Sequence, residues 1–271
     1  MLNLEPEDIE PAFPPEIEEF IFSLCAQGGL DNCKPLIFVA RRVYHWLRPY
    51  LYKVVIFHED RRHYGPRLDG KSLKIHGSYI RHILLWGVIS EEQCLHDPAT
   101  CLSWCPNVVD VALWDSDISY DQTLINQLLA LPLTHLSFDV TVFHSHLTRY
   151  STSKSASFTS VTHLDLIGAE VKLRVSKIKE YFPSLTHLAI NEKRRLSAQV
   201  ILDCWGDQLE VLIWYINRSQ ADPAHSVPDD PRVAVIYQVW EYVREWNKAT
   251  EDGPKSIWRI AEAKVEGRRR R

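Results

Sequence analysis

Residues 133–138, LTHLSF, carry a pattern that returns in residues 161–166, VTHLDL, and in residues 185–190, LTHLAI. Each copy has apolar residues at its first, fourth and sixth positions, and a threonine–histidine pair after the first of them. The alternation at the end of each copy is typical of a β-strand with one buried face. A pattern that returns at a regular interval predicts a repeat architecture, in which each unit packs on its neighbours.

The apolar spacing occurs in six segments altogether. They begin at residues 80, 108, 133, 161, 185 and 209, so the intervals are 24 to 28 residues, within the range of leucine-rich repeats. Val233, Val235 and Tyr237 fit a final strand, and a helix-like stripe of Leu124, Leu128 and Leu131 lies between two of the segments. We therefore predict an α/β fold in which residues 53–245 form an irregular leucine-rich-repeat-like solenoid with a parallel sheet, followed by a terminal helix and basic tail over residues 246–271.

Alternation along the strands predicts a second, outward-facing row. If Leu136 and Phe138 point into the core, His135 and Ser137 point away from it. The expected exposed row comprises His82, Asp110, His135, His163, His187 and Val211. Because exposed aromatic side chains often anchor protein interfaces, the candidates for contact with a target protein are Trp86, Trp114, His135, His163, His187 and Tyr215. The alternative is that terminal helices or loops cover these residues.

The histidines and cysteines are also considered as possible metal ligands or catalytic groups. Histidines on neighbouring strands could hold a metal, but repetition of the T-H-L string explains them more simply. Cys94, His96, Cys101 and Cys105 contain only one pair with zinc-site spacing, where a structural site normally has two. No phosphate-binding glycine loop, nucleophile elbow or zinc-protease helix occurs in the sequence. We predict no catalytic residue, no metal and no cofactor, and a metal-dependent or hydrolytic enzyme is the third alternative.

The composition and net charge limit the kinds of partner that the chain is expected to bind. The 271 residues include 45% hydrophobic and 24% charged residues, as expected of a folded protein, and the formal net charge is -4. This charge gives no general attraction to nucleic acid or membranes, and neither is predicted as a partner. The first residues lack a signal-peptide pattern, so a cytoplasmic or nuclear location with reduced cysteines is expected. Residues 268–271 are a run of arginine that fits a solvated tail or a nuclear import signal.

The amino-terminal part lacks the repeated strand pattern and instead has apolar residues at helical spacing. Residues 1–12 form an acidic, proline-rich lead. Ile17, Phe20, Ile21 and Leu24 then recur at helical spacing, and a second stripe of this kind runs from Leu36 onward. Two short helices cannot bury such stripes by themselves. The stripes must complete a core within this chain or dock on another protein, and their periodicity alone does not decide between the two.

Residues 13–52 resemble an F-box, especially the F-box-like segments of mushroom-type fungi. The similarity lies in PPEI at residues 14–17, IF at residues 21–22, V-x-RR-V-x-x-W at residues 39–46 and LY at residues 51–52. Residues 78–87, SYIRHILLWG, and the T-H-L strings are also similar to that family.

The resemblance implies a non-catalytic substrate receptor of a cullin-RING ubiquitin ligase. Its F-box would dock on a Skp-type adaptor and its repeats would hold an unidentified target protein. By motif match, the adaptor contacts would be Phe13, Pro14, Ile17, Ile21, Phe22, Val39, Arg42 and Trp46. The alternative from another class is a repeat scaffold without ligase association.

Overall fold

The computed structural model divides the chain into two compact units, residues 1–53 and residues 54–271. It describes residues 13–27, 29–58, 68–86, 97–114, 118, 121–139, 157–167, 175–190, 198–217, 229–238, 246–247, 250 and 256–270. The acidic lead over residues 1–12 lies outside these ranges, as do Cys94 and His96.

The first unit consists of three helices, α1 (Pro15–Ala26), α2 (Leu30–Leu36) and α3 (Arg41–Leu51). Pro15 occupies the first helical position of α1, where its missing N–H costs nothing. Between α1 and α2, Gly29 has a φ of 106°, a conformation that side chains with a Cβ rarely adopt. The small core of this unit contains Ala26, Cys33, Val43, Leu47 and Leu51.

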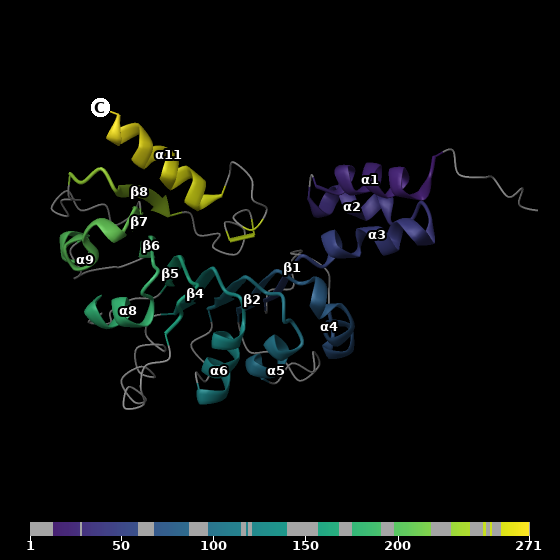
Figure 1. The fold of residues 1–271 in the computed structure, drawn as a ribbon, viewed down its shortest axis with the longest axis horizontal. Helices are drawn as coiled ribbons and strands as arrows, with labels where there is room; N and C mark the ends of the chain where they lie inside the picture. The colour runs from purple at the N-terminus through teal and green to yellow at the C-terminus, as the bar shows by residue number, and fades with distance from the viewer. Residues whose placement is uncertain are drawn as a thin grey trace, which may run out of the picture. The chain divides into compact units, whose positions relative to one another are not determined.

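The second unit is built on one eight-stranded sheet whose strands follow one another in chain order (Figure 1). The strands are β1 (Val54–His58), β2 (His82–Trp86), β3 (Asp110–Leu113), β4 (His135–Asp139), β5 (His163–Ile167), β6 (His187–Ile190), β7 (Val211–Asn217) and β8 (Val233–Gln238). Every neighbouring pair is parallel. The expectation of an α/β fold with a parallel sheet is confirmed.

The register places equivalent residues of the repeated pattern side by side. Leu136 pairs with Leu164, which pairs with Leu188, which pairs with Leu212. All four are buried. Helices α5 (Pro98–Ser103), α6 (Gln122–Ala130), α8 (Val175–Tyr181) and α9 (Ala198–Trp205) lie on one face of the sheet (Figure 1). Ala189 packs against Ala261 and Val265 of the terminal helix on the other face, so its neighbour Leu188 and the rest of the leucine row point towards these four helices. The core of the second unit therefore lies between the sheet and these helices.

Aspartates cap three helices of the second unit. The side chain of Asp69 accepts a hydrogen bond from the backbone N–H of Ser72 at the start of α4 (Gly70–His76). Asp97 and Asp121 do the same at α5 and α6. Such caps satisfy N–H groups that lack a partner within the helix. Short 3₁₀ turns, η1 (Gly77–Tyr79) and η3 (Gly206–Gln208), follow α4 and α9 and lead into β2 and β7.

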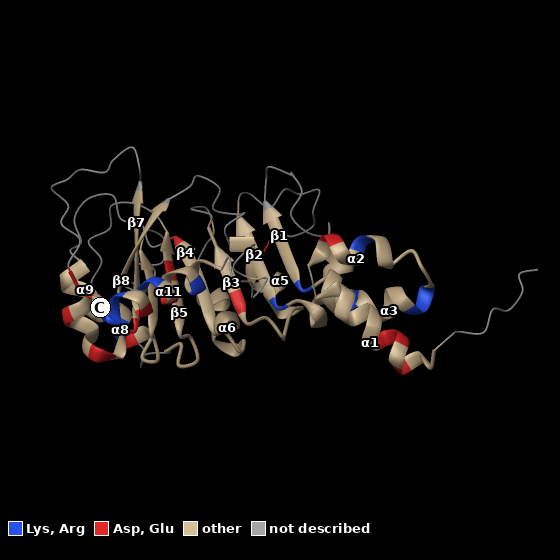
Figure 2. Ribbon diagram, turned by 90° about the horizontal axis from the view of Figure 1, so that it is seen from above, with Lys and Arg blue, Asp and Glu red and all other residues tan. Residues whose placement is uncertain are grey.

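A terminal helix, α11 (Ile257–Arg269), lies on the opposite face of the sheet, over the last strands, β6 to β8 (Figures 1 and 2). Ala261 and Val265 of α11 pack against Ala189, Val211 and Ile213. Arg268 donates a hydrogen bond to the backbone oxygen of Val233 at 2.7 Å. The basic end of the chain, blue in Figure 2, is therefore attached to the sheet in its described part and is not simply a solvated tail.

Within the described part of the chain, no helix combines the length and the apolar character that crossing a membrane would require.

Candidate functional site

The apolar stripe of α1 lies on an exposed side of the helical unit. Ile17, Ile21 and Leu24 share this side, and their exposed fractions are 47%, 41% and 49%. The core side of α1 is formed by Ala26 and Phe22. Helix α1 therefore carries apolar residues on two sides, and the described chain buries only one of them.

Further exposed apolar side chains lie in the connection between α2 and α3. There Phe38 and Val39 are 85% and 62% exposed. Seven of the eleven exposed large apolar side chains among the described residues belong to the small helical unit: Phe13, Ile17, Phe20, Ile21, Leu24, Phe38 and Val39. Apolar surface gathered in this way usually marks an interaction site.

The predicted adaptor contacts fall into two groups. The exposed group comprises Phe13, Pro14, Ile17, Ile21, Val39 and Arg42. Phe22 and Trp46 are half-buried and pack on each other across α1 and α3, with ring centroids 6.3 Å apart. Arg42 joins the same two helices, because its Nε donates a hydrogen bond to Oε2 of Glu18 at 2.9 Å. Phe20, Leu24 and Phe38 were not among the predicted contacts, although the helical stripes contain them.

In the second unit, a row of polar residues crosses the sheet on the face opposite the leucine row. His82 Nδ1 lies 3.3 Å from Oδ2 of Asp110 on the next strand. Further along, the rings of His135, His163 and His187 stack, with centroids 4.1 Å and 4.2 Å apart. Each histidine occupies the same position of its repeat, and the strand register aligns these positions, so the three rings lie directly beside one another.

The threonines fix the orientation of the stacked rings. Oγ1 of Thr134, Thr162 and Thr186 lies 2.8 to 2.9 Å from Nδ1 of the histidine that follows it. In each case the same hydroxyl also lies within hydrogen-bond distance of a backbone oxygen on the preceding repeat. With Nδ1 engaged in this way, the other ring nitrogen, Nε2, is left for a partner above the sheet.

The expectation of an exposed row is wrong for most of its members. His82, Asp110, His187 and Val211 are buried, and His135 and His163 are half-buried. For His163, His187 and Val211 the cause is α11. The ring of Trp258 stands edge-on to His163 and His187, at centroid distances of 5.0 Å and 6.0 Å.

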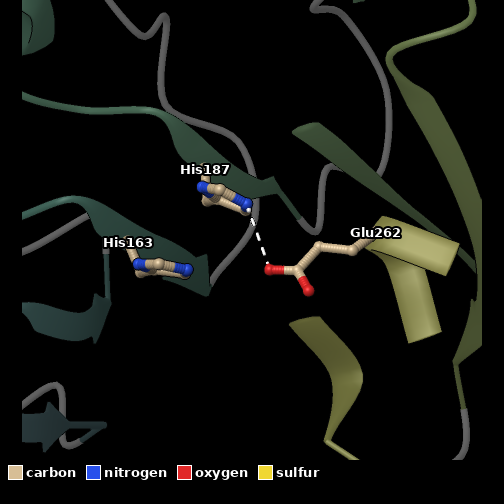
Figure 3. Close-up of side chains that lie close together, drawn as sticks. All are labelled: His163, His187 and Glu262. Atoms are coloured by element: carbon tan, nitrogen blue, oxygen red, sulfur yellow. Dashed lines mark ion pairs between the residues drawn. The ribbon is translucent and has the colours of Figure 1, made fainter. Parts of the chain in front are cut away.

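Glu262, one helical turn beyond Trp258, completes a cluster with two of the histidines. Its Oε1 lies 3.4 Å from Nε2 of His187. The potential metal-binding atoms of His163, His187 and Glu262 all lie within 4.8 Å of one another (Figure 3). Burial and the two neighbouring rings lower the pKa of His163 to about 2, so this ring is neutral at physiological pH. Burial also lowers the pKa of His187, although the carboxylate of Glu262 opposes the shift.

Aromatic residues cover another part of the same face. The rings of Trp86 and Trp114 are in edge-to-face contact at 5.7 Å, and Trp246 meets Trp114 at 6.4 Å. Trp114 is buried, whereas Trp86 and Tyr215 are half-buried. Tyr215 packs against the cluster formed by α11 and the sheet. None of these three predicted target contacts is freely exposed, because Trp246 and α11 lie over this face.

A polar chain runs below this aromatic cluster. Nε1 of Trp114 donates a hydrogen bond to Oγ of Ser137 at 2.7 Å, and Ser137 donates to Oδ2 of Asp165 at 3.3 Å. Burial raises the pKa of Asp165 to about 7. Its Oδ1 is buried without a hydrogen-bond partner among the described residues. Strand alternation indicated the direction of Ser137 and Asp165, but no local pattern indicated that they would be linked to a tryptophan.

Two members of the zinc set considered from the sequence, Cys101 and Cys105, fall within the described residues. Cys101 lies in α5, Cys105 follows two residues after its end, and both are buried free thiols. Burial raises the pKa of each to about 12, which disfavours the thiolate that a metal requires. Cys94 and His96 lie outside the described residues.

Comparison with models of protein families gave no match, and a search of curated proteins gave none either.

Proposed function

We propose that the chain is a non-catalytic recognition subunit of a cullin-RING ubiquitin ligase, working in the cytoplasm or nucleus. Residues 13–52 would act as the F-box that docks on a Skp-type adaptor. The second unit would be an irregular leucine-rich-repeat-like solenoid that binds a target protein. The resemblance of residues 13–52 to F-box segments of mushroom-type fungi supports the choice of partner.

One observation carries the proposal: the apolar stripe of α1 is exposed. An amphipathic helix normally turns its apolar side to the core. Here Ile17, Ile21 and Leu24 face away from the core of their own unit, and Phe38 and Val39 add to the apolar surface. Burying one such side chain stabilises a complex by about 1.5–3 kcal/mol before the costs of association.

The chemistry of this surface fits a helix that packs into an apolar groove of another protein. The exposed side chains recur at helical spacing, and a bonded pair, Arg42 and Glu18, fixes α3 against α1. A prearranged surface loses little conformational freedom on binding, which favours affinity.

The proposed target surface is less extensive than the sequence predicted. Of the six candidates, Trp114 and His187 are buried, and the other four are half-buried. His135 and Trp86 lie on strands ahead of those on which α11 packs, although Trp86 also packs against the cluster of Trp114 and Trp246. Target binding through this face would use the portion near β2 to β4.

The test is binding of the purified full chain to a purified Skp-type adaptor, measured by isothermal titration calorimetry. We expect a one-to-one complex for the wild type. Ile17→Asp should weaken it at least tenfold, because the substitution puts a carboxylate into an apolar interface. Since Ile17 is exposed, this variant should keep its fold, which circular dichroism would check.

Ile75→Asp is a matched control. Ile75 is 68% exposed and lies on α4 in the second unit, so its substitution should leave adaptor affinity within twofold of the wild type. The proposal fails if the wild-type chain does not bind the adaptor, or if both aspartate variants bind equally well. A chain that binds no adaptor would instead fit the repeat scaffold without ligase association.

A further inference from the structure

The contact between His187 and Glu262 requires a cation or a proton between its two atoms. Nε2 of His187 lies 3.4 Å from Oε1 of Glu262 (Figure 3). A carboxylate oxygen is only an acceptor when ionised, so it repels an unprotonated ring nitrogen. Either Nε2 carries a hydrogen atom, or a positive ion lies between the two groups.

The threonine hydroxyls allow both states. If Oγ1 of Thr186 donates to Nδ1 of His187, the neutral ring carries its hydrogen on Nε2 and donates it to Glu262. If Nδ1 carries the hydrogen, it donates to Oγ1, whose own hydrogen turns to the backbone oxygen of Thr162 at 3.4 Å. Nε2 then has a free lone pair. Thr162 gives His163 the same choice.

We propose that His163, His187 and Glu262 form a binding site for a divalent transition-metal ion of the zinc class, which joins α11 to strands β5 and β6. Two neutral imidazoles and one carboxylate are a ligand set that zinc accepts. The hydroxyls of Thr162 and Thr186 would hold the rings through Nδ1, as hydrogen-bonded outer groups commonly do at metal sites. This site is separate from the surface proposed for the adaptor.

The geometry needs only side-chain movement. Tetrahedral zinc with bonds near 2.0–2.1 Å places its ligand atoms about 3.3 Å apart. The three ligand atoms already lie within 4.8 Å of one another. The side chain of Glu262 is 47% exposed, so it has room to turn towards both rings. Because that side is open, water would supply the fourth ligand.

The ion would act as a clamp for the terminal helix. Ala261 and Val265 already hold α11 to the sheet by apolar contact. A ligand that binds only the folded arrangement adds stability in proportion to its occupancy. We therefore expect zinc to raise the melting temperature and to slow proteolysis within α11.

The test uses the full chain, stripped with EDTA, dialysed and titrated with zinc chloride in a calorimeter. The wild type should bind one equivalent. Glu262→Gln and His187→Gln should each weaken zinc binding at least tenfold and remove the rise in melting temperature. Glu262→Gln alters only an exposed helical side chain, so loss of the fold would not explain its effect.

His135→Gln is the matched control, because His135 has the same threonine partner and stacks on His163 but lies outside the cluster. Its zinc affinity should stay within twofold of the wild type. The site is refuted if the wild type binds no zinc at micromolar concentrations. It is refuted equally if Glu262→Gln binds as tightly as the wild type, or if His135→Gln loses as much affinity as His187→Gln.

Discussion

In each threonine–histidine pair of the sheet, the threonine hydroxyl provides a partner for Nδ1 of the ring. The hydroxyl lies within hydrogen-bond distance of the ring and of a backbone oxygen on the preceding repeat, as for Thr162. The ring then stacks on its neighbour. Buried polar groups need such partners. The pairs thus stabilise a partly covered polar row, and only two of the three histidines have Glu262 beside them.

The direction of these histidines followed from strand alternation, but their burial did not. His135, His163 and His187 point to the face opposite the leucines, as predicted. Two of them, His163 and His187, are covered by Trp258 and Glu262 of a helix far along the chain. No pattern within a repeat specifies which distant helix will pack on it.

The buried thiols provide a test of the core at the level of single residues. We expect Cys101 and Cys105 to resist a thiol reagent in the native chain at pH 8, because both are buried and burial raises their pKa to about 12. Cys25 is exposed and should react at once. Mass spectrometry of labelled peptides distinguishes the three positions.

The same thiols should make the protein less stable in alkali. In the unfolded chain they ionise near pH 8.5, whereas in the folded chain they keep their protons until about pH 12. The unfolded state therefore binds fewer protons above roughly pH 8.5, and the free energy of unfolding falls as the pH rises. Replacing both cysteines with alanine should reduce the dependence of the free energy of unfolding on pH.

In the labelling experiment, rapid reaction of Cys101 in the native chain would show that the core near α5 is more open than described.

At the scale of elements, the repeated spacing predicted the strands well. All six segments form strands, and Val233 begins a further strand, β8. The first apolar residue of each segment, such as Leu133 before β4, is buried just ahead of the strand. The predicted helix-like stripe from Leu124 to Leu131 corresponds to α6. A helix was also expected after the last strand, but the sequence could not indicate the face on which α11 packs, because packing depends on the assembled sheet.

The close approach between η1 and the end of α5 can be tested at Gly77. A Cβ added there would lie 2.8 Å from the carbonyl carbon of Trp104 and still closer to its oxygen. Because backbone atoms cannot turn aside as a flexible side chain can, Gly77→Ala should destabilise the protein by about 1–3 kcal/mol. Urea unfolding followed by circular dichroism gives the change.

Gly267→Ala serves as the comparison. This glycine lies in α11 with open space around it, so alanine should raise the free energy of unfolding by up to about 1 kcal/mol. If Gly77→Ala were as stable as the wild type, η1 could not approach Trp104 as closely as described.

At the scale of the whole molecule, the two units differ in how completely they bury their apolar residues. The sheet unit has a long leucine row enclosed by helices, whereas the helical unit leaves Ile17, Phe20, Ile21 and Leu24 exposed. Helical periodicity predicted that α1 would have an apolar side. It could not predict whether this chain or a partner covers that side, since both arrangements require the same pattern.

The most direct measurement is hydrogen–deuterium exchange of the full chain with and without a purified Skp-type adaptor. We expect adaptor binding to slow exchange in α1 (Pro15–Ala26) and α3 (Arg41–Leu51), and to leave strands β2 to β7 unchanged. Unchanged exchange throughout α1 at saturating adaptor, or protection confined to the sheet, would contradict the assignment of the helical unit as the docking surface.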